Sequence, residues 1–352
     1  MSYREEKLAQ ARAGMAGLAA DPGVDAIYLA GSLLSGLGSP TSDIDVYAVT
    51  TAARQEDAVQ IKSGKERLDV ETFTSDWADG ALGKVARWEI SRTDLRSKGL
   101  TREELDTLIR MRDREVVKDS PALDRITCAL DHSGDGLRRM TLALWALEAN
   151  GHLSDCRGAY ADGDLESAAL TGQFLMICAG KAVAAAADDL YVGEKWVFRQ
   201  LRRSAGDRFP HADFRRMQAG GWAADRDWIG FLTFFQTLMA ASQLLGWRAA
   251  AVGQWPFWHS GEQGYWRHPL YNVVHLTQGV LLNYELRRQF VIKPDVALIW
   301  ALCNGRTEAE IIPAAAALGE LLDGGEPVSA DRVTEVIAML TTRRLISAEQ
   351  YR

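Results

Sequence analysis

The sequence predicts an α/β (α+β) protein with a small mixed sheet, followed by a helical bundle and a C-terminal winged-helix-like domain. Residues 27–30 form a short apolar run, and residues 43–49 follow as a second strand pattern that begins with Asp43 and Asp45. Residues 66–73 alternate polar and apolar, as strands do. From about residue 120 to 247 the apolar residues recur at helical spacing instead. Residues 293–352 then contain three short helical patterns and a terminal strand pattern.

Length and composition indicate a soluble protein with several domains. The chain has 352 residues, of which 47% are hydrophobic, enough for two or three cores. We expect a first domain at 1–120, a helical bundle at 121–250, an aromatic-rich connector at 251–292 and the winged-helix-like domain at 293–352. A net charge of −7 argues against extended nucleic-acid binding. The N-terminus lacks a signal-peptide core, and four scattered cysteines suit a reducing cytosol, so a cytoplasmic location is expected: Cys128, Cys156, Cys178 and Cys303.

The helices of the first domain are predicted from spacing and capping residues. Residues 3–20 form an amphipathic pattern that Asp21-Pro22-Gly23 ends. Residues 76–90 and 101–117 are also predicted helices, and Thr101 with Glu104 forms a capping box for the second. We expect these two helices to pack on one face of the sheet.

The bundle contains one segment apolar enough to resemble a membrane span. Residues 130–150 and 164–189 have the strongest helical periods. Gln173, Lys181, Asp188 and Asp189 interrupt the second, and its uncharged run is too short to cross a bilayer. We therefore predict a buried bundle helix and no membrane partner.

The connector and the tail carry less specific patterns. Residues 247–271 are rich in tryptophan and tyrosine, which either stack a base or flat acceptor or fill the space between domains. In the tail, helices are predicted at 296–302, after a cap at Thr307, and at 332–342, with a short strand at 345–346.

The candidate site begins where the first strand ends. Gly31-Ser32 follows this strand, and Asp43 and Asp45 stand at the start of the next. Glycine lets a phosphate approach the backbone, and Ser32 offers a hydroxyl and an N–H at a possible helix N-terminus. Residues i and i+2 of a strand face one side, so the two carboxylates repel each other unless a cation lies between them. Together these residues predict a nucleoside triphosphate site with Mg²⁺.

A third carboxylate is predicted on the strand at 66–73. Asp69 and Glu71 share one face of it, and a neighbouring strand would bring Asp69 beside Asp43 and Asp45. There it would bind a metal or take the proton from an attacking hydroxyl. Glu71 lies on the same face, so either acid can fill this role.

These residues carry a resemblance to a known superfamily. Gly31-Ser32, then Ser42-Asp43-Ile44-Asp45-Val46, then Leu68-Asp69-Val70 resembles the signature of the DNA polymerase β-type nucleotidyltransferases. The small kanamycin- and streptomycin-modifying nucleotidyltransferases are the most similar members. The resemblance implies that Gly31, Ser32 and Ser42 bind the nucleotide. It also implies that Asp43 and Asp45 hold two Mg²⁺ ions, with Asp69 or Glu71 as third ligand or Asp69 as general base.

Two further resemblances are shorter. Lys195 follows Gly193 in a basic stretch similar to the lysine-containing, phosphate-contacting segment of the antibiotic-modifying enzymes, although a solvated basic helix face is an equal alternative. Residues 300–307 with 340–346 resemble winged-helix peptide-recognition domains of enzymes that modify ribosomal peptides. That resemblance implies a peptide or carrier-protein partner.

The expected function is transfer of a nucleoside monophosphate from an NTP to an acceptor hydroxyl, with release of pyrophosphate. The acidic composition and the bundle favour a small acceptor such as an antibiotic or a biosynthetic intermediate. Nucleotidylation of a protein, peptide or tRNA is the alternative, and a non-catalytic binding protein is a third possibility.

Overall fold

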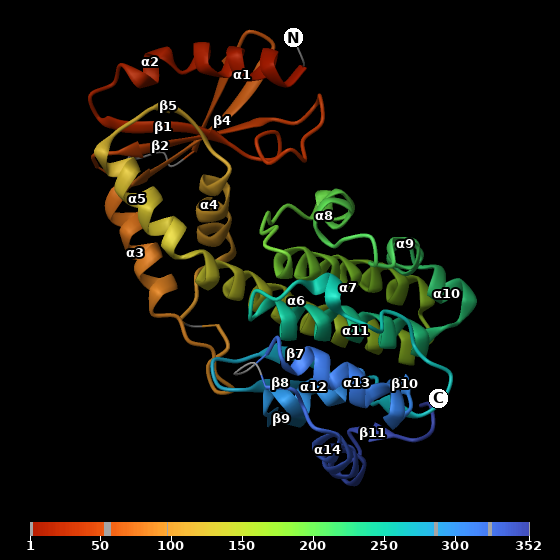
Figure 1. Ribbon diagram of the computed structural model, residues 1–352. Helices are drawn as coiled ribbons and strands as arrows, with labels where there is room; N and C mark the ends of the chain where they lie inside the picture. Colours follow the sequence, from red (N-terminus) through yellow and green to blue (C-terminus); the bar gives the residue numbers. More distant parts are fainter. Residues whose placement is uncertain (1–2, 53–57, 97, 285–287, 323–325, 352) are drawn as a thin grey trace. The chain divides into compact units, whose positions relative to one another are not determined.

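The computed structural model describes residues 3–52, 58–96, 98–284, 288–322 and 326–351 (Figure 1). These residues form two compact units. Unit 1 comprises Met1–Trp88, Lys98–Leu137 and Tyr191–Trp196, and unit 2 comprises Glu89–Ser97, Arg138–Leu190 and Val197–Arg352. Residues 191–196 therefore belong to unit 1, although they lie within the stretch predicted to be a helical bundle.

Unit 1 is built on a five-stranded mixed sheet in the order β3-β4-β2-β1-β5. The β2 and β4 strands run parallel and the other neighbours are antiparallel. The small mixed sheet that the sequence predicts is thus confirmed. The strands are β1 (Val24–Ala30), β2 (Ile44–Thr50), β3 (Ala58–Ser63), β4 (Glu66–Thr74) and β5 (Glu115–Lys118).

Helices cover both faces of this sheet (Figure 1). Leu8, Ala11 and Met15, from α1 and the turn after it, pack on a core that includes Ile44 and Leu68. The other face holds stacked Tyr28 and Tyr47, with ring centroids 5.2 Å apart, and contacts α3, α4 and α5. The helices are α1 (Tyr3–Gly14), α2 (Ala16–Ala19), α3 (Ser75–Ala86), α4 (Arg102–Arg112) and α5 (Pro121–His132).

The structure corrects the helix predicted at 101–117, and it divides the helices predicted at 3–20 and 130–150 into two each. The capping box is present, since Glu104 N–H donates to the Thr101 hydroxyl at 3.1 Å and Thr101 N–H donates to the Glu104 carboxylate at 2.8 Å. The helix ends at Arg112 rather than at 117, and residues 115–118 form β5 on the edge of the sheet. Val116 and Val117 are β-branched residues that favour strands, and pairing with β1 decides their conformation.

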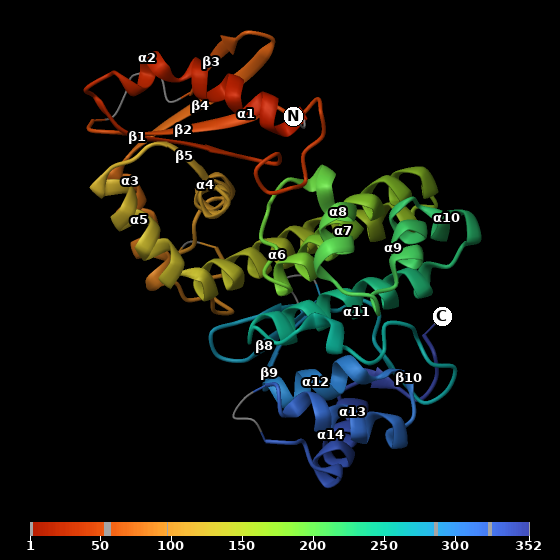
Figure 2. The ribbon, with the colours of Figure 1, turned by 45° about the horizontal axis from the view of Figure 1, so that its top comes forward.

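Unit 2 is mainly helical. Helix α11 lies at its centre, with α7 against one side and α12 and β7 against another (Figures 1 and 2). The helices that precede the aromatic segment are α6 (Gly134–Ala161), α7 (Leu165–Ala186), α8 (Val197–Ser204), α9 (His211–Gln218), α10 (Gly221–Asp225) and α11 (Trp228–Gly246). The short 3-10 helix η2 (Val252–Gln254) lies within that segment.

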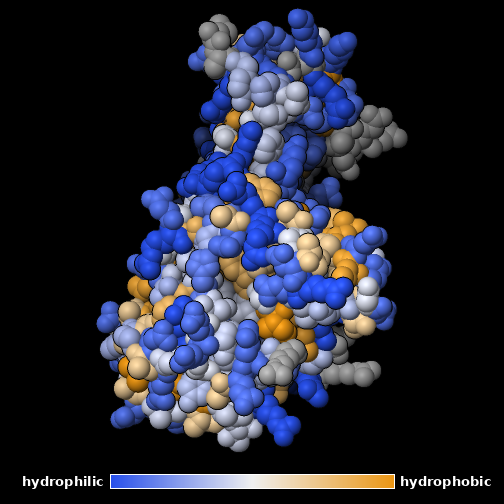
Figure 3. All heavy atoms as spheres, turned by 90° about the vertical axis from the view of Figure 1, so that its right-hand side faces the viewer, coloured by the Kyte–Doolittle hydropathy of each residue, from blue (hydrophilic) through white to orange (hydrophobic). Residues whose placement is uncertain are grey.

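Helices α7 and α11 are both long and apolar enough to span a membrane by composition. Their most apolar windows are 67% and 89% buried within the protein, as in core helices of soluble proteins. Polar side chains of α11 are buried with partners: Gln236 donates to the carbonyls of His268 and Tyr271 at 2.9 and 2.7 Å. On the face drawn in Figure 3, exposed hydrophobic residues are interspersed with hydrophilic ones.

The predicted connector contains more regular structure than its sequence indicates. Trp247, Trp255, Trp258, Trp266 and Tyr271 are buried, which favours the space-filling interpretation of this aromatic segment. Its second half forms an antiparallel sheet in the order β7-β8-β9. These strands, with the preceding β6, are β6 (Tyr265–Arg267), β7 (Asn272–His275), β8 (Val280–Tyr284) and β9 (Arg288–Ile292).

The C-terminal part shares its sheet and its core with the preceding residues. Both β10 and β11 pair with β6, which lies before residue 293. Arg267 of β6 is buried, and its guanidinium donates to the Ala301 carbonyl, the Thr233 carbonyl and the Thr237 hydroxyl at 2.8, 3.2 and 2.7 Å. One side chain thus joins α11 to α12. The remaining elements are α12 (Pro294–Leu302), β10 (Asn304–Arg306), α13 (Glu308–Gly319), α14 (Ala330–Thr342) and β11 (Ile346–Ser347).

Arg267→Ala should lower the free energy of unfolding by about 3 kcal/mol or more, because it leaves buried carbonyls without their donor and opens a cavity. Urea denaturation followed by tryptophan fluorescence measures this. The matched control is Arg343→Ala, an exposed arginine in the same unit whose loss should change stability by less than about 0.5 kcal/mol. Equal urea midpoints for the two variants would contradict the assigned role of Arg267.

Candidate active site

Strand register brings three of the four predicted carboxylates together in unit 1. Asp45 pairs with Ala30 of antiparallel β1 on one side and with Asp69 of parallel β4 on the other. Tyr47 pairs with Glu71 in the same way. Because strand side chains alternate, Asp45, Asp69 and Glu71 share one face, while Ile44, Val46, Leu68 and Val70 enter the core on the opposite face.

The Asp45 carboxylate packs directly on the backbone of Gly31. A Cβ at position 31 would lie 1.9 Å from Asp45 Oδ2 and 2.8 Å from Asp45 Cγ, far inside van der Waals contact. Gly31 also has a φ of +91°, a conformation that L side chains rarely adopt. Two independent constraints therefore require glycine here, and both lie at the predicted phosphate-binding turn.

The loop after Gly31 is a series of turns and not the helix N-terminus expected for Ser32. Ser35 N–H donates to the Gly31 carbonyl at 3.0 Å. The Ser32 carbonyl accepts from the N–H groups of Leu37 and Gly38 at 2.9 and 2.6 Å. These backbone hydrogen bonds hold the loop in consecutive turns. Gly36 and Gly38 have low helix propensity, so the turns do not continue as a helix.

Ser42 and Asp43 differ in their surroundings. Ser42 is buried, and its hydroxyl accepts from Ser39 N–H at 2.8 Å, so it closes the loop that leads into β2. Asp43 is exposed immediately before β2. Its charge acts on Arg67, as does that of Asp69, so Asp43 and Asp69 lie in the same electrostatic neighbourhood.

Arg110 of α4 is a central member of the site that the sequence analysis missed. Its Nη1 lies 2.5 Å from Asp45 Oδ2, and its Nε lies 2.8 Å from Asp106 Oδ2. Burial raises the pKa of Asp45 to about 6, and the Arg110 charge opposes this rise without cancelling it. In the sequence, the Asp106–Arg110 spacing indicated no more than an ion pair within a helix.

The two acids of β4 have different partners. Arg67 Nε lies 3.3 Å from Asp69 Oδ1 at the surface. Glu71 is partly buried, and burial raises its pKa despite the nearby Arg110 charge and a hydrogen bond with Tyr47. Asp69 is thus the acid in register with Asp45, and Glu71 is the acid whose pKa is raised.

Residues 191–196 pack on the glycine loop within unit 1. Tyr191 and Trp196 form a small apolar cluster with Leu37, and the Tyr191 and Ser32 hydroxyls are hydrogen-bonded. The Arg110 guanidinium lies 5.8 Å from the centroid of the Tyr191 ring. Lys195 belongs to η1 (Glu194–Trp196) and is exposed, with its Nζ 5.2 Å from the centroid of the Trp196 ring. The structure therefore brings the segment that carries Lys195 beside Ser32.

A cavity of about 350 Å³ opens beside these residues in unit 1. Arg102, Glu103 and Asp106 line it from α4, and Val192 and Gly193 line it from the 191–196 segment. Arg102 forms an ion pair with Glu194, with 2.5 Å between Arg102 Nη2 and Glu194 Oε1. Since Asp106 also contacts Arg110, the cavity adjoins the carboxylate cluster.

No protein-family model and no curated protein matches this chain. The function of the site therefore has to be inferred from the geometry of its residues. Among the described residues, no three His, Cys, Asp or Glu side chains converge as a ready-made metal site. The side chains of the site nevertheless offer carboxylate oxygens, the ligands that Mg²⁺ prefers. In the structure, Arg110 balances the charge of Asp45 and Arg67 balances that of Asp69.

Gly31→Ala should displace the Asp45 carboxylate, because the added Cβ would overlap its Oδ2. For the function proposed below, we expect nucleotide and Mg²⁺ binding to fall at least tenfold, with a loss of stability of about 1–2 kcal/mol from the strained φ. Calorimetric titration and thermal melting measure the two effects. Gly163→Ala is the control, because Gly163 also has a positive φ but no atom lies within 4 Å of the position that an added Cβ would take. Equal binding losses in both variants would show that general destabilisation, and not displacement of the Asp45 carboxylate, is responsible.

Proposed function

We propose that unit 1 transfers a nucleoside monophosphate from an NTP to an acceptor hydroxyl and releases pyrophosphate. The observation that supports this most is the register of Asp45 and Asp69 beside the Gly31 turn, on which the Asp45 carboxylate packs. Acids on one sheet face next to a glycine turn combine the two requirements of phosphoryl transfer: oxygen ligands for divalent cations and a close approach of phosphate to backbone.

Asp43, Asp45 and Asp69 are the residues that would hold Mg²⁺. When bound, Mg²⁺ would neutralise charge on the triphosphate and on the departing pyrophosphate. The Gly31–Ser32 turn contributes backbone N–H groups and the Ser32 hydroxyl on the phosphate side. Lys195, carried by the segment that packs on Leu37 and Ser32, contributes a cation to the same side.

The reaction itself is an in-line displacement at the α-phosphorus. A bond forms between the acceptor oxygen and this phosphorus, while the bond to the bridging oxygen breaks and its electrons leave with pyrophosphate. The acceptor proton moves to a carboxylate. Asp69, in register with Asp45, is the first candidate for this proton, and Glu71 is the alternative because burial raises its pKa.

Arg110 is a competitor for the carboxylate that Mg²⁺ requires. Its ion pair with Asp45 is short and only about one fifth exposed, with 18% and 22% of the two side chains accessible. A cation that binds Asp45 must displace this guanidinium or share the carboxylate with it. Asp106 offers Arg110 a second partner on the same helix, so its release from Asp45 leaves it paired.

Asp43→Asn and Asp45→Asn should each reduce transfer about a thousandfold or more, equivalent to roughly 4 kcal/mol of lost charge stabilisation. The measurement is acceptor-dependent pyrophosphate release by the purified protein with Mg²⁺ and each NTP in turn. Small hydroxyl compounds, peptides and tRNA form separate acceptor arms. A variant that keeps a tenth of wild-type turnover would contradict the assignment of that aspartate to the metal.

Asp69→Asn and Glu71→Gln are the matched comparison in the same assay. We expect the larger loss from Asp69→Asn, because Asp69 pairs in register with Asp45 while Glu71 pairs with Tyr47. A larger loss from Glu71→Gln would instead assign the proton transfer to Glu71. No pyrophosphate release by the wild-type protein in any arm would contradict the proposed reaction.

Mg²⁺ binding should weaken as the pH falls through about 6, where Asp45 takes up a proton that excludes the cation. The sign follows from burial, which raises the pKa of this carboxyl above its ordinary value near 4. Calorimetric titration of Mg²⁺ with nucleotide across this range measures the midpoint. A midpoint near 4 would contradict a buried ligand, and Asp45→Asn should abolish the transition near 6.

A further inference from the structure

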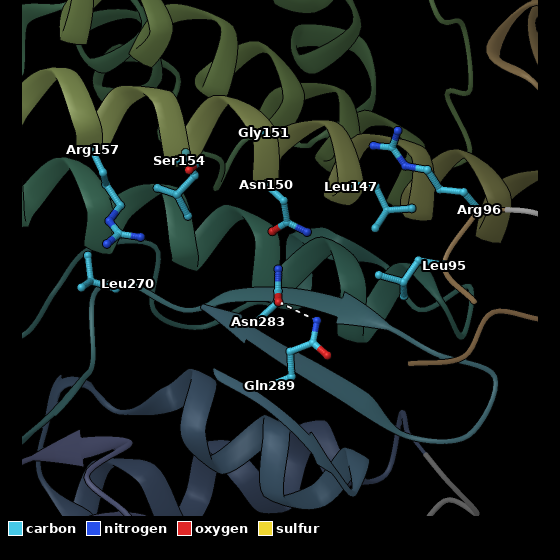
Figure 4. Close-up of a pocket in the computed structure, with 11 residues that line it drawn as sticks. Leu95, Arg96, Leu147, Asn150, Gly151, Ser154, Arg157, Leu270, Asn283 and Gln289 are labelled. Atoms are coloured by element: carbon cyan, nitrogen blue, oxygen red, sulfur yellow. Dashed lines mark hydrogen bonds between the residues drawn. The ribbon is translucent and has the colours of Figure 1, made fainter. Parts of the chain in front are cut away.

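A second cavity lies wholly within unit 2 and has no connection with the residues of the proposed function. Its volume is about 760 Å³, within the range of small-molecule sites. Figure 4 shows α6 on one side and the β7-β8-β9 sheet on the other, with Asn150 above Asn283 and with Arg157 and Arg96 toward opposite ends.

Obligatory backbone partners fix which end of the Asn150 amide faces this cavity. Val273 N–H donates to Asn272 Oδ1 at 2.8 Å, and Asn272 Nδ2 donates to the Ala146 carbonyl at 3.0 Å. The same Nδ2 donates to Asn150 Oδ1 at 2.8 Å. Because a backbone N–H can only donate and a carbonyl can only accept, Asn150 must use its oxygen toward Asn272. Its NH₂ group remains for the cavity.

Asn283 presents a second amide to the cavity, from the sheet. It is buried in β8, and its Oδ1 accepts from Gln289 Nε2 of β9 at 3.2 Å. Strand register puts Asn272, Asn283 and Gln289 in one row across the sheet. In Figure 4 the Asn283 nitrogen points toward α6 and Asn150, so the Asn283 NH₂ group is also directed at the cavity.

The charged side chains among the described residues that line the cavity are basic. Arg157 and Arg96 are among its lining residues, and none of the described lining residues is acidic. Arg157 is held in place, with its Nη2 2.9 Å from the Tyr284 hydroxyl and its guanidinium 4.5 Å from the centroid of that ring. Burial lowers the pKa of nearby His268, and the charges of Arg288 and Arg157 lower it further, as expected in a positive environment.

The rest of the lining is largely apolar, with Leu95, Leu147, Leu153 and Leu270 around the polar row. We propose that this cavity binds a small organic oxyanion, a carboxylate or a phosphate monoester. Its acceptor oxygens would meet the amide and guanidinium donors, and its apolar body would contact the leucines. A neutral amide of the same shape offers one carbonyl acceptor but no charge to the guanidinium groups, and a cation would be repelled by them.

The test uses the full-length protein with 2-naphthoate and 2-naphthyl phosphate as anionic probes and 2-naphthamide as the neutral probe. Ligand-observed NMR titration measures each dissociation constant. We expect saturable binding of at least one anion, at least tenfold tighter than that of the amide. The two anionic arms identify carboxylate or phosphate as the preferred group. Equal affinity for anion and amide, or no saturable binding of either anion, would overturn the proposal.

Asn150→Asp is the sharpest variant, because it keeps the oxygen that accepts from Asn272 and replaces only the NH₂ group with a negative oxygen. It should weaken anion binding at least tenfold, and Arg157→Met should weaken it without adding an acid. Gln254→Glu is the charge-matched control, since Gln254 is exposed in unit 2 and does not line the cavity. Anion binding that survives both cavity variants, or that falls equally in Gln254→Glu, would overturn the proposal.

Discussion

The contact between the Asp45 carboxylate and the Gly31 backbone is the constraint on which unit 1 depends. It exists because β1 and β2 are antiparallel, so the residue after Ala30 lies beside the first acidic residue of β2. Any side chain at position 31 would occupy the space of the carboxylate. The turn, the acid and the strand pairing therefore have to be present together, and Asp69 joins them through the parallel pairing of β4.

A cluster of acids on one sheet face needs compensating positive charge, and unit 1 supplies it from two directions. Arg67 approaches Asp69 from the surface along β4, and Arg110 approaches Asp45 from α4. The two pairs differ in burial, since the Arg67 side chain is 58% exposed and that of Arg110 is 18% exposed. Solvent screens the first pair, whereas the second strongly influences the charge state of Asp45.

Unit 2 uses buried polar side chains to join segments that are distant in sequence. Gln236 of α11 binds the carbonyls of His268 and Tyr271, and Arg267 binds carbonyls of α11 and α12. Such groups are costly to bury without partners, so each specifies one packing arrangement. The amide row across β7, β8 and β9 follows the same principle: Asn272 donates to Ala146 and Asn150 of α6, while Asn283 lines the cavity.

The sequence by itself determined the strand patterns of β1, β2 and β4, the capped start of α4, and the acids that lie on one face. Each follows from local rules: side-chain alternation, capping chemistry and glycine at a turn. Tertiary structure alone decided that residues 115–118 pair with β1, that Arg110 reaches Asp45, and that Tyr191 packs beside Ser32. These contacts join residues far apart in the chain, and no local spacing encodes them. The orientation of the Asn150 amide is likewise set by Asn272, which reaches it only through the packing of β7 against α6.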